Sequence, residues 1–315
     1  MARSQSQIGL ICETLLSVGS DERRSLQGVN TDGLIEGNRA FAVDVGSEFR
    51  LDPESTLAQE FDKIITAPGG GNWLLCGGGD DPVDVYTLGD LPASVGGVIT
   101  LLSSITYRIH GELNLLGDRI VMSAGSGLEG TGIALLVTSN TVAAVTCTTG
   151  TPARIHNLAI TNNGTGPGVT WDGDGDGSQL WMHDCSIYGA PALDLTGVAG
   201  DSVYVYDCRF YGVATSWGVE LSDAWSAVSF VGCRFLGDGD GMRITSGEGT
   251  VANLVINGCE FSTPTGKTGV TQNTADAVVQ GRLVGNLFWG AGTPIDGNVA
   301  TTEWIARGNT AFADF

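Results

Sequence analysis

The hydrophobic pattern of the C-terminal two thirds of the chain recurs every 23 to 27 residues. Six short segments align without gaps, and in each of them apolar positions alternate with polar ones on both sides of a small or polar residue. The segments are RIHNLAI (154–160), WMHDCSI (181–187), VYDCRF (205–210), FVGCRF (230–235), INGCEF (256–261) and LVGNLF (283–288). Alternation of period two predicts β-strands, and a repeat of this length predicts a solenoid.

One column of this alignment predicts a corner between two strands. It contains only residues that tolerate a left-handed backbone: Asn157, Asp184, Asp207, Gly232, Gly258 and Gly285. The flanking columns are large and apolar, and they predict side chains that point into the core. They are Ile155, Met182, Val205, Phe230, Ile256 and Leu283 before the corner, and Ile160, Ile187, Phe210, Phe235, Phe261 and Phe288 after it.

A third strand follows in each repeat. Its apolar pairs are Leu193 with Leu195, Val219 with Leu221, and Met242 with Ile244, and Val270 continues them. Three short strands per turn, joined by one tight corner and two variable loops, predict an all-β protein, a single-stranded parallel β-helix. We expect the β-helix to be right-handed, because crossover connections between parallel strands are generally right-handed. We expect it to fill residues 98–315 with a C-terminal cap, with residues 106–123 and 132–149 forming earlier, less regular turns.

The cysteines fit the same arrangement. Cys185, Cys208, Cys233 and Cys259 share one column, so we predict that they stack as small buried groups. Parallel stacking separates their β-carbons by about 4.8 Å, beyond the usual disulfide range, and one ligand per turn cannot surround a zinc ion. The seven cysteines of the chain, an odd number, agree with reduced thiols.

Residues 1–97 differ in composition, and we predict an N-terminal capping or attachment region. Residues 33–78 suggest short strands separated by turns. The spacing of Ile8, Ile11 and Leu15 predicts one short amphipathic helix. The N-terminus has no convincing signal peptide, because its apolar stretch is short and is followed by Glu13. We therefore expect synthesis in a cytoplasm.

Net charge narrows the choice of partners. The chain has 35 acidic and 15 basic residues, a formal net charge of −20, which repels nucleic acid and anionic membranes. We expect neither nucleic-acid binding nor membrane insertion. With 48 glycines and 42% apolar residues, the composition excludes collagen and a disordered chain.

Four stretches carry a resemblance to a known family. "GNRAFAVDVGSEFRLDPES" and "IITAPGGGNWLL" resemble a small β-module found near the start of tailed-bacteriophage virion appendages, ahead of a β-helix. "LPASVGGVITLLSSITYRIHGELNLLGDRIVMSAGSGLEGTG" resembles the first turns of such proteins, and "WIARGNTAFADF" resembles their last. The resemblance implies a virion structural protein, often a homotrimer, such as a tail spike, capsid decoration or short fibre. Its partners would be other virion proteins, contacted through the N-terminal region, and host surface glycans.

The best candidates for catalysis are Asp194 and Glu220, which are predicted to face outward on the third strand, beside Arg243. Stacked turns would bring the two carboxylates about 5 Å apart, near the separation in retaining glycosidases. The alternative is a surface charge column that Arg243 neutralises. An enzyme, a polysaccharide hydrolase or lyase, is therefore the second hypothesis, after a structural protein without catalysis.

Aromatic side chains dominate the other outward faces, where they predict a binding surface or a subunit interface. The outward residues are Trp181, His183, Tyr204 and Tyr206 before the corner, and Tyr188, Tyr211, Leu236 and Trp289 after it, and all except Leu236 carry rings. The width of this surface favours subunit packing over sugar binding.

Two possible metal sites can be considered, although no other cofactor is expected. In WDGDGDGSQL (171–180), Asp172, Asp174 and Asp176 resemble the start of a calcium loop, but His183 stands where an EF-hand has glutamate. Tight Asp-Gly turns are the alternative. His156 and His183 share a column, and we expect the corner to turn Asp184 away from them, leaving a solvated or interface pair.

Overall fold

The computed structural model describes residues 9–12, 39–42, 47–52, 64–66, 72–76, 82–147, 153–172, 178–197, 201–213, 215–223, 225–245, 251–273, 278, 280–290, 293–297 and 304–312. Contacts divide the chain into two compact units, Met1–Val83 and Asp84–Phe315. Our division at residues 97 and 98, and the attachment role given to the first region, stay predictions. Among the described residues, no helix has the length and apolar character needed to cross a bilayer.

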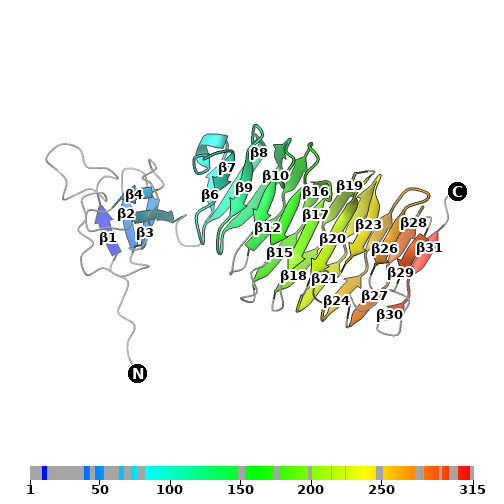
Figure 1. Ribbon diagram of the computed structural model, residues 1–315. Coiled ribbons are helices and arrows are strands. Elements are labelled where there is room, and N and C mark those ends of the chain that lie inside the picture. The colour runs from blue at the N-terminus through cyan, green and yellow to red at the C-terminus, as the bar shows by residue number, and fades with distance from the viewer. Residues whose placement is uncertain are drawn as a thin grey trace, which may run out of the picture. The chain divides into compact units, whose positions relative to one another are not determined.

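The N-terminal unit contains a five-stranded sheet of order β1-β2-β3-β5-β4 (Figure 1). Its strands are β1 (Gly9–Cys12), β2 (Arg39–Ala42), β3 (Ser47–Asp52), β4 (Ile64–Thr66) and β5 (Asn72–Cys76). The short strands predicted within residues 33–78 are confirmed. The helix predicted around Ile11 is wrong over Gly9–Cys12, because these residues pair in parallel with β2. Three apolar residues at helical spacing are a weak signal, and pairing with a sheet overrides it.

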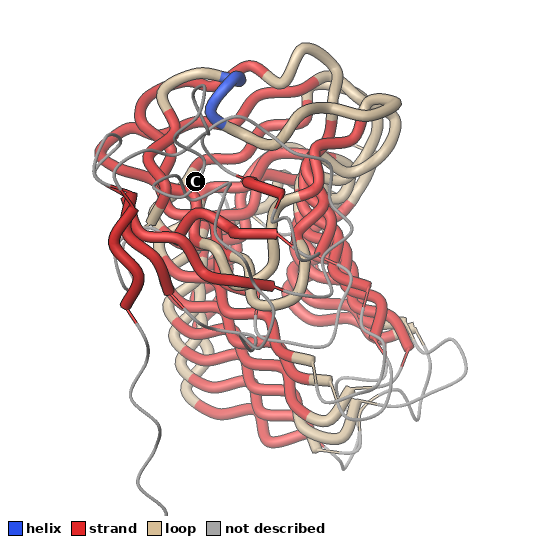
Figure 2. The backbone as a smooth tube through the Cα atoms, turned by 90° about the vertical axis from the view of Figure 1, so that its left-hand side faces the viewer, coloured by secondary structure: helices blue, strands red, loops and turns tan. Residues whose placement is uncertain are grey.

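The second unit is a parallel β-helix of about eight turns, which confirms the predicted fold class (Figures 1 and 2). Strands before the corner form one ladder: β12 (Ala153–His156), β15 (Gln179–His183), β18 (Ser202–Tyr206), β21 (Ala227–Val231), β24 (Leu254–Asn257), β27 (Gly281–Val284) and β30 (Trp304–Arg307). Strands after it form a second: β13 (Ala159–Asn162), β16 (Ser186–Gly189), β19 (Arg209–Gly212), β22 (Arg234–Gly237), β25 (Glu260–Ser262), β28 (Leu287–Trp289) and β31 (Thr310–Phe312).

The third strands form a nine-stranded sheet: β7 (Val98–Thr100), β9 (Arg119–Met122), β11 (Val145–Cys147), β14 (Val169–Asp172), β17 (Leu193–Gly197), β20 (Trp217–Asp223), β23 (Asp240–Ile244), β26 (Thr268–Gln272) and β29 (Thr293–Gly297). The less regular early turns are also confirmed, since β8 (Thr106–Asn114) pairs with β10 (Gly127–Thr138) and β10 pairs with both β12 and β13. Before them lie β6 (Val83–Val85) and a 3-10 helix, Leu88–Asp90.

The predicted register of the core is confirmed strand by strand. Ile155 pairs with Met182, and the same column continues through Val205 and Phe230. In the second ladder, the rings of Phe235 and Phe261 stack with centroids 4.3 Å apart and planes 4° apart. Phe288 continues the stack at 4.9 Å from Phe261. These side chains are buried, so the core is a continuous apolar column along the helix axis.

The corner column has the left-handed backbone that the sequence predicts. The φ angles are 52° at Asn157, 53° at Asp184 and Asp207, and 62° to 66° at the glycines that follow. The structure adds a seventh turn, with Gly308 at the corner (φ 65°), which the alignment of six segments omitted.

The column after the corner holds the cysteines, buried and unbridged as predicted. At the C-terminal end, amides replace the thiols. Asn286 is fully buried, accepts a hydrogen bond from the backbone N–H of Cys259 at 2.8 Å and donates one to the carbonyl of Ile256 at 3.0 Å. In the next turn, the Asn309 side chain likewise accepts a hydrogen bond from the backbone N–H of Asn286 and donates one to the carbonyl of Leu283. These amides saturate backbone groups at the corner, where the strand ladders are interrupted.

Candidate functional site

The first candidate site lies on the outer face of the third-strand sheet. Asp194, Glu220 and Arg243 occupy successive strands in register, as predicted, and Thr170 continues the column one strand earlier. Arg243 Nη1 lies 3.5 Å from Glu220 Oε1. The Arg243 guanidinium also lies 5.6 Å from the centroid of the Trp217 ring, and the Asn273 side-chain oxygen, with the amide turned to accept, is 3.1 Å from its Nε and Nη2. Trp217, Glu220 and Asn273 therefore fix the arginine.

The two carboxylates at this face are in different electrostatic environments. The pKa of Asp194 is raised to about 6, first by burial of the carboxyl and then by the nearby charges of Glu220 and Asp172. Glu220 instead forms an ion pair with the Arg243 guanidinium. An acid with a raised pKa beside a paired carboxylate is an arrangement that can support proton transfer.

Sequence reasoning missed Trp217 and Asn273. Trp217 has the same parity as the inward Val219, so simple alternation places it in the core. Gly218 and Val219 are both buried, however, and the alternation shifts by one residue between them. A glycine within a strand is the available signal for such an irregularity.

The second candidate site is the aromatic face before the corner. The Trp181 ring stacks on Tyr204 with centroids 4.4 Å apart and planes 27° apart. Trp181 Nε1 donates a hydrogen bond to Gln179 Oε1 at 3.2 Å, which orients the indole. An open groove of about 340 Å³ lies here, lined by Arg154, Ile155, His156, Trp181, Met182, His183 and Tyr206. Sequence reasoning did not include Arg154 in this face.

The predicted aromatic residues do not all come together. Tyr188 and Tyr211 lie on neighbouring strands, followed by Leu236. Trp289 pairs with Ser262, and therefore lies farther along the ladder. Trp181, Tyr188 and Trp289 are exposed at 39%, 40% and 38% of their surface. The result is two outward rows on adjoining ladders rather than one compact pocket.

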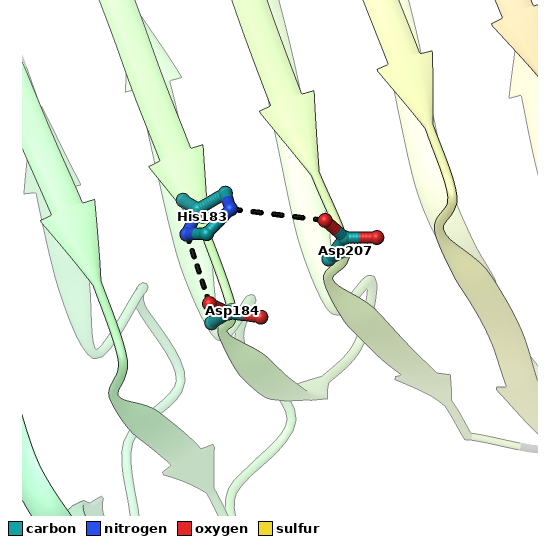
Figure 3. A group of neighbouring side chains, drawn as sticks. All are labelled: His183, Asp184 and Asp207. Atoms are coloured by element: carbon teal, nitrogen blue, oxygen red, sulfur yellow. Dashed lines mark ion pairs between the residues drawn. The ribbon is translucent and has the colours of Figure 1, made fainter.

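The histidine pair has carboxylate neighbours. His156 and His183 are register partners, as expected. The expectation that Asp184 turns away from His183 is wrong: His183 Nδ1 lies 2.9 Å from Asp184 Oδ2, and Nε2 lies 3.7 Å from Asp207 Oδ2 (Figure 3). The left-handed corner brings the Asp184 side chain back beside the preceding residue. His110 belongs to an earlier turn, where its Nε2 is 2.7 Å from Asp84 Oδ1.

The segment WDGDGDGSQL is described only in part. Trp171 and Asp172 end strand β14, with the Trp171 ring fully buried and Asp172 exposed. Asp174 and Asp176 lie outside the described residues, so the calcium hypothesis stays a prediction. Trp171 is therefore a core residue rather than part of a surface turn.

Comparison with known proteins assigns no family to the chain: no family model matches, and no curated protein matches. Three solved structures are similar, all of them tailspikes of Acinetobacter phages. The tailspike gp49 of Acinetobacter baumannii bacteriophage Fri1, a capsular polysaccharide depolymerase, is 12% identical with a TM-score of 0.41, over 96% of this chain and 75% of that one. The tailspike of phage vB_ApiP_P1 is 11% identical with a TM-score of 0.36, over 98% and 71%. That of A. baumannii phage AM24 is 12% identical with a TM-score of 0.26, over 90% and 63%.

At these identities and TM-scores, the likeness assigns no activity to this chain. The fold rests on its own strand register, which defines a parallel β-helix.

Proposed function

We propose that the protein is a structural component of a tailed-phage virion, a homotrimeric β-helix spike, decoration or short fibre on the capsid or tail. The observation that carries the proposal is the pair of outward aromatic rows, in which Trp181, Tyr188 and Trp289 are exposed on the solenoid surface. Exposed aromatic rows on a regular surface are typical of a contact with a partner. Packing of three copies would bury them.

The solenoid suits a mechanical role. Each turn binds its neighbours through parallel ladders, so the backbone is saturated within the column and the assembly is stiff. The sequence resemblance of the N-terminal segment to phage appendage modules supports attachment to other virion proteins through that region. Host glycans are the alternative ligands of the same aromatic rows, since sugar rings stack on aromatic side chains.

Sedimentation equilibrium of the purified chain tests the trimer. We expect three times the mass of one chain, and we expect Trp181→Asp together with Tyr188→Asp to shift the equilibrium toward monomers, because charges would be buried at the interface. Asn163→Asp, at an exposed position outside the aromatic rows, is the control and should leave the trimer intact. A stable wild-type monomer would contradict the trimer.

Mass spectrometry of purified particles tests the virion location directly, and absence of the protein from the particles would overturn that location.

A carbohydrate-active enzyme is the second candidate, favoured by the raised pKa of Asp194 beside Glu220. Asp194 would act as the acid and Glu220 as the second carboxylate. Neighbouring strands lie about 4.8 Å apart, close to the separation in retaining enzymes. If this function is correct, Asp194→Asn and Glu220→Gln each lower cleavage of a host polysaccharide by about 100-fold or more. Unchanged cleavage by both variants excludes the pair.

The calcium hypothesis for Asp172, Asp174 and Asp176 has a separate test. If a calcium ion bridges these carboxylates, a chelator lowers the melting temperature of the wild type, and Asp174→Asn removes that sensitivity. Identical melting curves with and without the chelator reject the ion.

A further inference from the structure

Two consecutive corners carry carboxylates where later turns carry glycine. Asp184 and Asp207 both have φ 53°, whereas the corners that follow are Gly232, Gly258, Gly285 and Gly308. A left-handed backbone is strained for a residue with a side chain, and two carboxylates on neighbouring strands repel each other. The third polar corner, Asn157, uses its amide to donate a hydrogen bond to the carbonyl of Gly130 at 2.7 Å. The two aspartates need a different explanation.

His183 lies between the two carboxylates at the end of β15 (Figure 3). Its Nδ1 is 2.9 Å from Asp184 Oδ2, a hydrogen-bonding distance. When Asp184 accepts the Nδ1 proton, the lone pair of the neutral ring is on Nε2. That nitrogen is 3.7 Å from Asp207 Oδ2, too far for a hydrogen bond. This separation suits two atoms that bind the same metal ion. With metal–ligand bonds of about 2.0–2.1 Å, two ligand atoms of one ion lie up to about 4 Å apart.

The surrounding backbone holds this geometry. The N–H groups of Asp184 and Asp207 donate to the carbonyls of Tyr206 at 3.1 Å and Val231 at 3.0 Å. Gly232 leaves room for the Asp207 carboxylate, because a β-carbon at position 232 would lie 2.4 Å from Asp207 Oδ1. Glycine at position 232 therefore leaves the space that the Asp207 carboxylate of the preceding turn occupies.

Among the described residues, the arginines beside these carboxylates form no ion pair with them. Arg209 and Arg234 line an adjoining groove of about 330 Å³ with Asp184 and Asp207. Within the part of the chain that the structure describes, neither arginine forms an ion pair with the two aspartates, and Arg234 Nε binds Glu260 at 3.2 Å. A divalent cation would supply the missing positive charge.

We propose that His183 Nε2 and the Asp207 carboxylate bind a divalent transition-metal ion of the zinc type, with Asp184 orienting the imidazole from the second coordination shell. An imidazole combined with a carboxylate favours zinc, cobalt, nickel or copper, whereas calcium and magnesium prefer oxygen ligands only. The three side chains are exposed at 55%, 55% and 62% of their surface, so water completes the coordination.

Titration of the tag-free, metal-depleted full chain with Zn²⁺, followed by calorimetry, tests the site. We expect the wild type to bind one equivalent of Zn²⁺ per chain. In His183→Ala and Asp207→Asn, the affinity for Zn²⁺ should fall by at least about 10-fold, so that this equivalent is lost. Asp184→Asn should weaken binding by about 10-fold, because the ring loses its orienting carboxylate but keeps its ligand atom. The matched control is His156→Ala, which removes the histidine of the same column one turn earlier and should leave the equivalent in place.

A second readout separates this site from thiols elsewhere in the chain. Co²⁺ bound by imidazole and carboxylate gives visible absorption without a thiolate charge-transfer band, and both signals are compared in the wild type and in His183→Ala. Circular dichroism establishes that each variant is folded. The proposal is overturned if the wild type binds no zinc, if His183→Ala keeps the equivalent, or if His156→Ala loses as much affinity as His183→Ala. A 10-fold excess of Ca²⁺ that displaces the zinc would also overturn it.

Discussion

At the scale of the residue, the side chain at Asp194 couples stability to pH. Its folded pKa of about 6 lies above its ordinary value of 3.8, chiefly through burial. The folded state therefore favours the protonated form, and the resulting stability is present below pH 3.8 and is lost as the pH rises through 6. We expect the free energy of unfolding of Asp194→Asn, relative to the wild type, to increase between pH 4 and pH 7. Urea unfolding at a series of pH values measures this.

High salt provides the control for that experiment. Salt screens the repulsion from Glu220 and Asp172 but not the cost of burial, so most of the pH dependence should persist at high ionic strength. A difference in stability between variant and wild type that stays constant from pH 4 to pH 7 would show that Asp194 ionises freely in the folded state.

The corner glycine Gly258 acts through backbone conformation alone. Gly258 has φ +62°, and no atom lies within 4 Å of the position that a β-carbon would take there. Gly258→Ala should therefore lower the free energy of unfolding by about 1 kcal/mol through strain, without a steric clash. Gly89→Ala is the matched control, because Gly89 is not left-handed and its nearest neighbour would be 3.6 Å away. Equal stability of the two variants would contradict this explanation.

At the scale of the element, the stacked phenylalanines connect the strands of the second ladder. Phe261 lies between Phe235 and Phe288 and is fully buried. Phe261→Ala should lower the free energy of unfolding by about 3–5 kcal/mol, because it removes two ring contacts and leaves a cavity. Ser262→Ala, the next residue on the outward face, should change it by less than about 0.5 kcal/mol. Urea unfolding compares the two, and similar midpoints would show that the ring column does not stabilise the helix.

Part of this element-level packing could be predicted from the sequence, and part could not. Period-two alternation and the corner column predict the ladders, because both are local properties of the backbone. The third strand also contributes Gly241 and Gly269, where a β-carbon would lie 2.7 Å and 2.6 Å from the rings of Phe261 and Phe288. Their role depends on a contact across the core, which spacing along the chain does not reveal.

The candidate site shows the same limit. Asp194, Glu220 and Arg243 could be aligned because each lies at a fixed distance from an apolar column. The contact of His183 with Asp184 and Asp207 could not, since it depends on where a left-handed corner directs a side chain. The pairing of Gly9–Cys12 with β2 was also missed, because the partner strand lies about thirty residues away and follows no repeat.

At the scale of the whole molecule, the repeat makes a prediction about deletion. Removing residues 209–233 joins Cys208 to Arg234, and both flanking residues keep their places in the alignment. Because each turn contacts mainly its neighbours, the shortened chain should fold with similar circular dichroism and a cooperative melting transition. Removing residues 209–234 joins Cys208 to Phe235 instead and shifts the following strand by one residue. That shift turns its apolar side chains outward, so this variant should aggregate or melt without cooperativity. If the two deletion variants have the same circular dichroism and the same melting behaviour, the turns are not interchangeable units. The stacking of repeated turns would then no longer explain the stability of the β-helix.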